Sequence, residues 1–243
     1  MTGREVAMLH MVGATLRGTA HINEGKPNQD AFQVGEDFAA VADGVGSTRN
    51  AELASRSAVE CFARGIRRID VNLVRRQMLN LLRSINDEVY VRAMPGLTTL
   101  VGVWFPPWED PARPFWGLSL GDSRAYSIDP ARAGPDRLRV LTMDDAQTHK
   151  DHRMRILETS VGHRQFNQGT CPMFEGELSV GEAILLCSDG LWGALEGMPS
   201  LQDMLVASID TRHLRQPSLK AVLQIAGKAS RDDATAAVVY NDA

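Results

Sequence analysis

The chain contains few cysteines, and their spacing argues against a zinc site. Its 243 residues include three, namely Cys61, Cys171 and Cys187. The count is odd, and no two of them have the spacing of zinc ligands. Cys61 and Cys187 lie within apolar patterns, which predicts that their thiols are buried. This use of cysteine indicates a reducing compartment.

A long apolar segment is also lacking. Near the N-terminus only residues 8–12 are mainly apolar, and a polar residue interrupts them. So short a run predicts neither a signal peptide nor a membrane-spanning helix. The expected location is therefore the cytoplasm, without a membrane partner.

The charge balance has no basic excess. There are 26 Lys and Arg against 30 Asp and Glu, a net charge of -4. This balance argues against a broad nucleic-acid surface, so no nucleic-acid partner is expected. Arginines do gather at 64–68, but apolar residues alternate with them at helical spacing, which favours a solvated helix face.

Repeats, low-complexity linkers and strict strand–helix alternation are absent. Apolar residues recur at helical spacing in four stretches, 51–66, 72–91, 199–209 and 217–229. Strand-like runs occur at 98–105, 115–120, 125–128, 138–141 and 235–240. Grouped strands with helices between them disfavour a parallel doubly wound sheet and favour an α+β sandwich of antiparallel sheets covered by helices.

One polar segment, residues 144–177, shows no clear periodicity, and it predicts a flap or loop. It contains His149, Asp151 and His152, which lie close together in the sequence. Histidines three apart on a polar loop are more often solvated than metal-bound, and no third ligand is evident nearby.

The most informative feature is a set of aspartates in short, glycine-flanked patches. These are Asp30, Asp43, Asp122, Asp189 and Asp232. Three of them directly follow an apolar run, and the last directly precedes one. Carboxylates at the ends of buried strands can converge on one spot, and their oxygens are the ligands that Mg2+ and Mn2+ prefer.

Two of these aspartates are followed by glycine. Asp43-Gly44 and Asp189-Gly190 are ordinary turn dipeptides, and either one alone predicts a turn. Both, however, end a strongly apolar run. Glycine also lets its own carbonyl approach a ligand closely, so a carboxylate beside an accessible carbonyl is a sensible ligand set for these cations.

Five motifs in a fixed order resemble one family of enzymes. They are Asn-Gln-Asp-Ala-Phe at 28–32, Ala-Asp-Gly-Val-Gly at 42–46, Gly-Asp-Ser-Arg-Ala-Tyr at 121–126, Leu-Cys-Ser-Asp-Gly-Leu-Trp at 186–192 and Arg-Asp-Asp-Ala-Thr at 231–235. Together they resemble the PP2C-type (PPM) metal-dependent serine/threonine phosphatases. Residues 18–21 and 25–27 are similar to a bacterial branch of that family. The resemblance extends from about Gly13 to Tyr240.

The resemblance implies a fold, a cofactor and residue roles. The fold is α+β, a four-layer α-β-β-α sandwich of two antiparallel sheets flanked by helix pairs, as a single domain over 1–243. The cofactors are two Mn2+ or Mg2+ ions, and a third metal is left open. The implied roles are Asp43 as bridge between two ions, the Gly44 carbonyl on one of them, Asp189 and Asp232 on the second, Asp30 on a metal-bound water, and Asp122 at a third, weaker metal.

Two cations held by these residues would account for hydrolysis of a phosphate ester. Two cations about 3.5–4 Å apart can share a water and lower its pKa towards neutrality, so that it attacks phosphorus in line. Phosphoryl transfer depends mainly on positioning and charge neutralisation, which two metals supply. We therefore expect an enzyme that hydrolyses phosphoserine or phosphothreonine in proteins modified by a partner kinase, and that acts as a monomer.

Several positions depart from the family pattern. Gly193 stands where the third metal's second aspartate is common, and Val45 stands where animal members carry a proposed general-acid histidine. Gly25 occupies the expected place of the phosphate-contacting arginine, for which Lys26 or His21 is the candidate substitute. These departures support an alternative, a catalytically weak phosphoprotein-binding regulatory module of the same fold.

A rival motif is present at 117–121. Gly-Leu-Ser-Leu-Gly matches the nucleophile elbow of α/β-hydrolases, with Ser119 as nucleophile. That motif needs a helix after the serine, whereas the sequence after it predicts a turn and another strand. The hydrolase hypothesis is therefore disfavoured.

Overall fold

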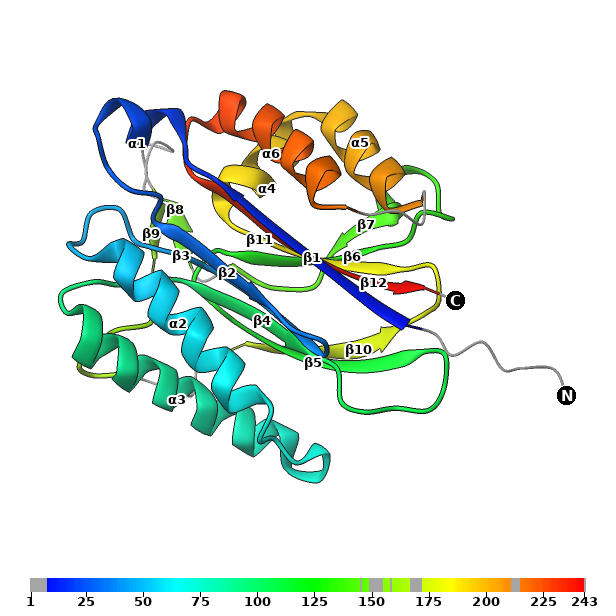
Figure 1. Cartoon of the computed structure of the whole chain (residues 1–243), viewed down its shortest axis with the longest axis horizontal. Coiled ribbons are helices and arrows are strands. Elements are labelled where there is room, and N and C mark those ends of the chain that lie inside the picture. Colours follow the sequence, from blue (N-terminus) through cyan, green and yellow to red (C-terminus); the bar gives the residue numbers. More distant parts are fainter. Residues whose placement is uncertain are drawn as a thin grey trace, which may run out of the picture.

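Two five-stranded antiparallel sheets lie at the centre of the structure, a computed structural model that describes residues 8–144, 146–148, 155–157, 159–166, 172–210 and 215–242 (Figure 1). The first sheet has the order β1 (Met8–Leu16), β12 (Ala234–Asp242), β11 (Ala183–Cys187), β6 (Arg124–Ile128) and β7 (Leu138–Val140). The second has the order β10 (Met173–Leu178), β5 (Arg113–Leu120), β4 (Leu100–Trp104), β3 (Phe38–Asp43) and β2 (Asp30–Val34).

Helices cover the outer face of each sheet. The second sheet is covered by α2 (Ala51–Ile66) and α3 (Val74–Ala93). The first is covered by α4 (Asp189–Gly197), α5 (Pro199–Asp210) and α6 (Gln216–Ser230). Figure 1 shows the resulting four layers, which confirms the expected α-β-β-α sandwich. One face carries three helices in place of the expected pair.

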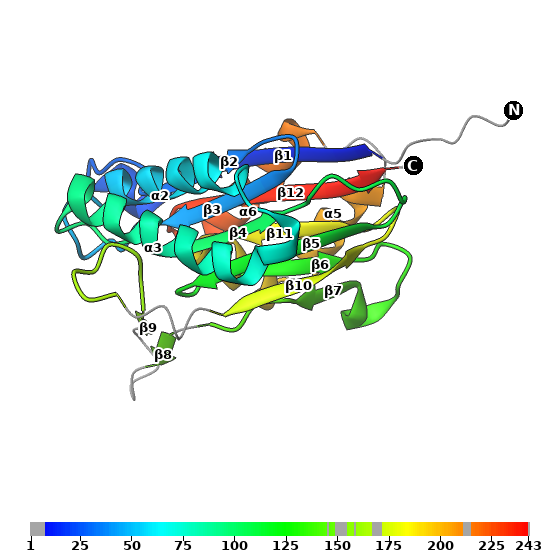
Figure 2. The same ribbon diagram turned by 90° about the horizontal axis from the view of Figure 1, so that it is seen from below.

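Short elements complete the described chain. They are α1 (Thr19–Asn23), the 3-10 turns η1 (Val71–Leu73) and η2 (Gly134–Arg137), and a hairpin of β8 (Ala146–Thr148) and β9 (Arg155–Leu157). Seen from the side of α2 and α3, the hairpin lies beyond the edge of both sheets (Figure 2). Within the described residues, no helix combines the length and apolarity needed to cross a bilayer.

Strand β3 shows how the sandwich accommodates continuous apolar runs. Ala39 and Val41 face the first sheet, whereas Ala40 and Ala42 face α2 and α3. Successive side chains of a strand point to opposite faces, and both faces of this strand are covered. The run is therefore apolar throughout, and Asp43, the first polar residue after it, is the last residue of the strand.

The element predictions hold best where periodicity is strong. The helix expected at 51–66 is α2, and the one expected at 72–91 is α3 preceded by η1. Strand β1 was not predicted, because its polar and apolar residues do not alternate regularly. Helix α4 was not predicted either, because Asp189-Gly190 has the composition of a turn.

The segment 144–177 is only partly a loop. Its last residues belong to β10, which pairs with β5 from Met173↔Leu118 to Leu178↔Arg113 and forms the edge of the second sheet. A flap would therefore end before Met173. His149, Asp151, His152 and Cys171 lie outside the described residues.

The packing of Phe62 makes the α2 layer testable. Its side chain is fully buried on α2, lies 6.1 Å from the ring of Phe38, and occupies the space above Gly102 of β4. Phe62→Ala is expected to lower the free energy of unfolding by about 3–5 kcal/mol, because a cavity remains in the core. Val91→Ala, on the exposed face of α3, is the control and should change it by less than about 0.5 kcal/mol. Urea denaturation measures both, and equal effects would contradict this packing.

Candidate metal centre

Asp30 and Asp43 face each other across two neighbouring strands. Asp30 is the first residue of β2 and Asp43 the last of β3, and the two are direct partners in the antiparallel register. Like charges directly opposite each other destabilise a sheet. The register therefore places two carboxylates where a cation between or beside them is favourable.

The electrostatics of Asp43 show which carboxylates gather here. Its pKa is raised well above the usual range, first by burial and then by the negative charges of Asp30, Asp189, Asp122 and Asp232. The other four aspartates singled out in the sequence thus all act on Asp43, although they come from four separate segments. Convergence at one end of the sandwich is the arrangement that the strand ends predicted.

Asp30 is buried, and its carboxylate already accepts a hydrogen bond from within the protein. Burial raises its pKa to about 7, which hydrogen bonds from Ser188 and Thr235 oppose and the charges of Asp233 and Asp189 reinforce. The Ser188 hydroxyl donates to Asp30 Oδ2 at 2.7 Å and accepts from the Thr235 amide at 3.0 Å. One serine therefore joins three of the five motifs.

The end of β3 is fixed by the two threonines that precede β4. The carbonyl of Asp43 accepts from the Thr98 hydroxyl and from the Thr99 amide, both at 2.8 Å. The Asp43 amide donates to Thr99 Oγ1 at 2.9 Å, and that oxygen lies 2.7 Å from Ser123 Oγ. These bonds tie the Asp43 backbone to the turn that carries Asp122.

Position 44 has no room for a side chain, so it requires glycine. A Cβ at this position would lie 2.5 Å from the Ala51 carbonyl oxygen and 2.7 Å from that of Gln29. Because both atoms belong to the backbone, a side chain cannot be accommodated by a rotamer change. The Asp-Gly pair is thus more than a turn, since it lets the backbone after Asp43 pass directly against α2 and the segment before β2.

Asp189 begins α4. It follows β11 and lies in the first turn of the helix, where a negative charge is favoured by the helix dipole. A Cβ on Gly190 would come within 2 Å of the Asp233 carbonyl oxygen. The glycine of the second Asp-Gly pair therefore allows α4 to begin directly against Asp233, the residue before β12.

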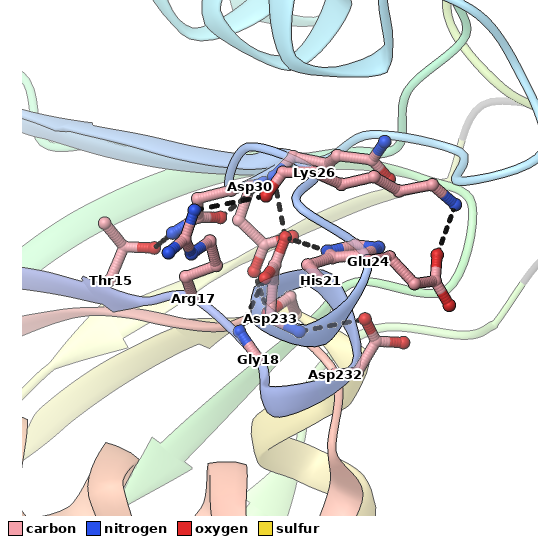
Figure 3. A network of polar contacts seen from close by, with 12 residues as sticks. Thr15, Arg17, Gly18, His21, Glu24, Lys26, Asp30, Asp232 and Asp233 are labelled. Carbon is pink, nitrogen blue, oxygen red and sulfur yellow. Dashed lines mark hydrogen bonds and ion pairs between the residues drawn. The ribbon is translucent and has the colours of Figure 1, made fainter.

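The adjacent pair Asp232 and Asp233 divides two roles. Asp233 is 2% exposed and accepts hydrogen bonds from the Gly18 amide at 2.7 Å and the Gln29 amide at 2.6 Å. Its own amide donates to Asp232 Oδ1 at 2.8 Å. Figure 3 shows Asp233 at the centre of this network, with Asp232 at its rim. Asp232 is exposed, which leaves it as the carboxylate of the pair suited to a cation.

The two candidate phosphate contacts are both engaged. His21 Nδ1 lies 2.8 Å from Asp233 Oδ2, and Lys26 Nζ lies 2.7 Å from Glu24 Oε2 (Figure 3). Gly25, between them, has a φ of +67°, which disfavours an arginine at this place. Arg17 donates to the Lys26 carbonyl at 3.2 Å and braces the same turn.

Asp122 lies on the turn between β5 and β6. It is 7% exposed, and its carbonyl accepts from the indole of Trp192 at 2.9 Å. The next turn of α4 carries Gly193, where an added Cβ would meet nothing within 4 Å. The space for a second carboxylate is therefore present, but the side chain is missing.

Arg124 connects the Asp122 turn to α4. Its guanidinium makes two hydrogen bonds to the Asp144 carboxylate, both at 2.8 Å, and one to Glu196 at 2.6 Å. It also lies 3.6 Å from the centre of the Trp192 ring. Together with the indole bond to Asp122, these contacts hold α4 against the turn.

Sequence reasoning missed several residues that hold this centre. Thr98, Thr99 and Ser188 are hydroxyl residues in apolar surroundings, and only their hydrogen bonds reveal their part. The competing nucleophile Ser119 is buried in β5, donates to the Ser123 carbonyl at 3.3 Å, and is followed by a turn and β6. The elbow therefore lacks the helix it needs.

The donor set suits hard divalent cations, because it consists of carboxylate and carbonyl oxygens. Among the described residues, no three carboxylate, imidazole or thiol side chains are grouped closely enough to hold one ion by themselves. Each ion would thus need carbonyl and water ligands in addition. Gln29 Oε1, beside Asp30 in sequence, is buried without a hydrogen-bond partner among the described residues, and an acceptor of this kind suits a cation's water.

The raised pKa of Asp30 predicts the pH dependence of the metal-free protein. Between the ordinary value of 3.8 and about 7, the folded state keeps a proton that the unfolded state has lost. Stability should therefore fall as pH rises through this window. Melting temperatures in the presence of a chelator measure the trend, and Asp30→Asn should show a flatter one. An unchanged slope in the variant would contradict the buried environment of Asp30.

Known proteins resemble this chain in fold. PppA, a regulatory component of the type VI secretion system of Pseudomonas aeruginosa, superposes with a TM-score of 0.74 at 20% identity, over 97% of this chain and 99% of that one. The Mycobacterium tuberculosis phosphatase PstP gives 0.72 at 19% identity over 97% and 99%. Stp1 of Staphylococcus aureus gives 0.74 at 18% identity over the full length of both chains.

Comparison with curated proteins finds no match. The family model described as protein phosphatase 2C, in contrast, matches residues 17–226, which include every segment that carries the clustered aspartates except the one around Asp232. The chain belongs to the protein phosphatase 2C family of metal-dependent phosphatases.

Proposed function

We propose that this protein is a serine/threonine phosphatase that hydrolyses phosphoserine and phosphothreonine in proteins with the help of two divalent cations. The observation that carries the proposal is the electrostatic environment of Asp43, on which four other aspartates act. Such a concentration of negative charge is unfavourable unless cations neutralise it. Among the similar structures, a PstP catalytic domain was solved in complex with two manganese ions.

The residues divide the work of holding the two ions. Asp43 would bridge them, the Gly44 carbonyl would serve one, and Asp189 and Asp232 would serve the other. When bound, Mn2+ or Mg2+ supplies a water of lowered pKa and neutralises charge on the phosphoryl group. The remaining residues keep these ligands in place: Thr98 and Thr99 hold the Asp43 backbone, and the Asp233 amide donates to the Asp232 carboxylate.

Asp30 would orient the water that attacks. Its Oδ2 accepts from Ser188, which fixes the plane of the carboxylate and leaves Oδ1 for a further donor. The raised pKa of Asp30 belongs to the metal-free state, and nearby cations would favour its ionised form. An ionised carboxylate can accept a proton from the water during attack.

The substrate would be a phosphorylated protein from a partner serine/threonine kinase. We infer a cytoplasmic location and a monomer as the working unit. The buried thiols of Cys61 and Cys187 support a reducing compartment.

The first test replaces the bridging carboxylate. Asp43→Asn should lower kcat/KM on a phosphothreonine peptide by about a hundredfold or more, because one charge shared by both ions is lost. Asp136→Asn, on the exposed turn η2, is the control and should match the wild type. Phosphate release in the presence of Mn2+ measures both. Full activity in Asp43→Asn, or activity that survives chelation, would rule out the mechanism.

One observation favours the alternative, a regulatory module that binds phosphoproteins with weak catalysis. His21 and Lys26, the candidates for contacting phosphate, are held by Asp233 and Glu24. Titration calorimetry with Mn2+ separates the two functions. Metal binding with turnover supports the enzyme, and metal binding without turnover supports the module.

The third-metal position yields a gain-of-function prediction. Asp122 would hold this ion weakly, because Gly193 supplies no second carboxylate. Gly193→Asp fits the free space of α4 and should add a Mn2+ site to the binding isotherm. Gly193→Asn, of equal size without the charge, is the matched control. An isotherm of Gly193→Asp with no additional site would contradict this account of Asp122.

A further inference from the structure

Four exposed arginines lie on the segment 67–76, which forms the turn between α2 and α3 and the start of α3. They are Arg67, Arg68, Arg75 and Arg76. Within the part of the chain that the structure describes, none of them forms an ion pair, although ion pairs form close by on the same helices. There Glu88 is held by Arg64 and Arg92, and Glu60 by Arg92.

The acidic residue of the turn is also engaged locally. Asp70 Oδ1 accepts from the amide of Asn72 at 2.9 Å and from its side chain at 3.0 Å, so it caps η1. The segment 67–76 thus combines four arginines with a single aspartate in a chain whose net charge is -4. The local charge is therefore positive, although the net charge of the molecule is negative.

Two of the arginines carry charges that the helix dipole disfavours. Arg75 and Arg76 lie in the first turn of α3, which contains no acidic residue. The helix dipole favours anions at this end and disfavours cations by about 0.3–1 kcal/mol each. The helix dipole therefore disfavours these two charges, whereas an anionic partner would neutralise them.

The same turn exposes apolar side chains and borders two hollows. Val71 and Leu73 are 43% and 51% exposed between the arginines. An open hollow of about 450 Å³ is lined by Arg64, Arg67, Arg68 and Glu60. A second, of about 370 Å³, lies between α2 and α3, and Glu88 is among its lining residues. Arg64 and Arg68 line both, so the two hollows adjoin.

One arginine is already oriented. The guanidinium of Arg67 lies 5.5 Å from the centre of the Phe38 ring, a cation–π contact that restrains its rotamers. Arginine in such a setting presents a planar set of donors that matches carboxylates. Ordering it beforehand lowers the entropic cost of binding.

We propose that the surface formed by Arg67, Arg68, Val71, Leu73, Arg75 and Arg76 docks an acidic segment of a partner protein that also carries apolar side chains. Carboxylates of the segment would pair with the arginines, and its apolar side chains would cover Val71 and Leu73. Adjoining hollows suit an extended chain better than a bilayer, which would call for a larger apolar surface.

The surface is remote from the metal centre. Figure 1 shows the α2–α3 turn at the opposite end of α2 from the strand ends that carry Asp30 and Asp43. Sixteen residues of helix correspond to about 24 Å. The surface therefore serves recognition rather than hydrolysis, and its proposal does not rest on the proposed function.

The test uses charge reversal on the full chain. A fluorescein-labelled peptide rich in glutamate, with two leucines, is titrated with metal-free protein and followed by fluorescence anisotropy. The wild type should bind, and more weakly as salt is raised. Arg75→Glu/Arg76→Glu should bind at least tenfold more weakly with an equal or higher melting temperature, because the new charges suit the start of α3.

Controls separate the sources of binding. Arg139→Glu/Lys220→Glu makes the same charge change on exposed residues of β7 and α6, and it should bind like the wild type. A peptide without the leucines should bind less tightly, which reports on Val71 and Leu73. Equal binding by the wild type and Arg75→Glu/Arg76→Glu would overturn the proposal. So would wild-type binding to phosphatidylserine vesicles but not to the peptide.

Discussion

Repulsion between carboxylates is the constraint around which this protein is built. Asp30 and Asp43 are partners across β2 and β3, and Asp122, Asp189 and Asp232 add their charges to the same region. A fold gains nothing from placing carboxylates together, and it tolerates them only when the surrounding structure fixes them. The sandwich does so from both sheets, and the charge it concentrates is what a pair of divalent cations can neutralise.

The supporting residues explain how the carboxylates stay in place. Ser188 connects Asp30 to the start of β12, and Thr99 connects Asp43 to the turn of Asp122. Asp233 clamps the segment from Gly18 to Gln29 through backbone amides. Hydrogen bonds with backbone amides and hydroxyls hold Asp30, Asp43 and Asp232 without introducing a competing charge. Of the two adjacent aspartates, the buried Asp233 therefore holds the structure together, and the exposed Asp232 is the one suited to bind a cation.

The sequence predicted the sandwich and the gathering of the aspartates, because strand ends are marked by apolar runs that stop at an acid. It did not predict α4, since Asp189-Gly190 has the composition of a turn and only the space beside Asp233 shows why glycine is needed there. It also could not show that His21 and Lys26 are engaged, because Asp233 and Glu24 reach them through the fold. Residues 64–68 were interpreted as a solvated helix face. Arg64, Arg67 and Arg68 are all exposed, which agrees with that interpretation, and Arg64 also pairs with Glu88.

The most direct measurement is anomalous scattering from crystals grown with Mn2+. The account predicts two peaks beside Asp43, one of them reached by both Asp189 and Asp232, with the Gly44 carbonyl directed at the other. Well-ordered crystals with no peak at Asp43, or with manganese bound only elsewhere, would contradict the claim that these carboxylates are gathered to hold two ions.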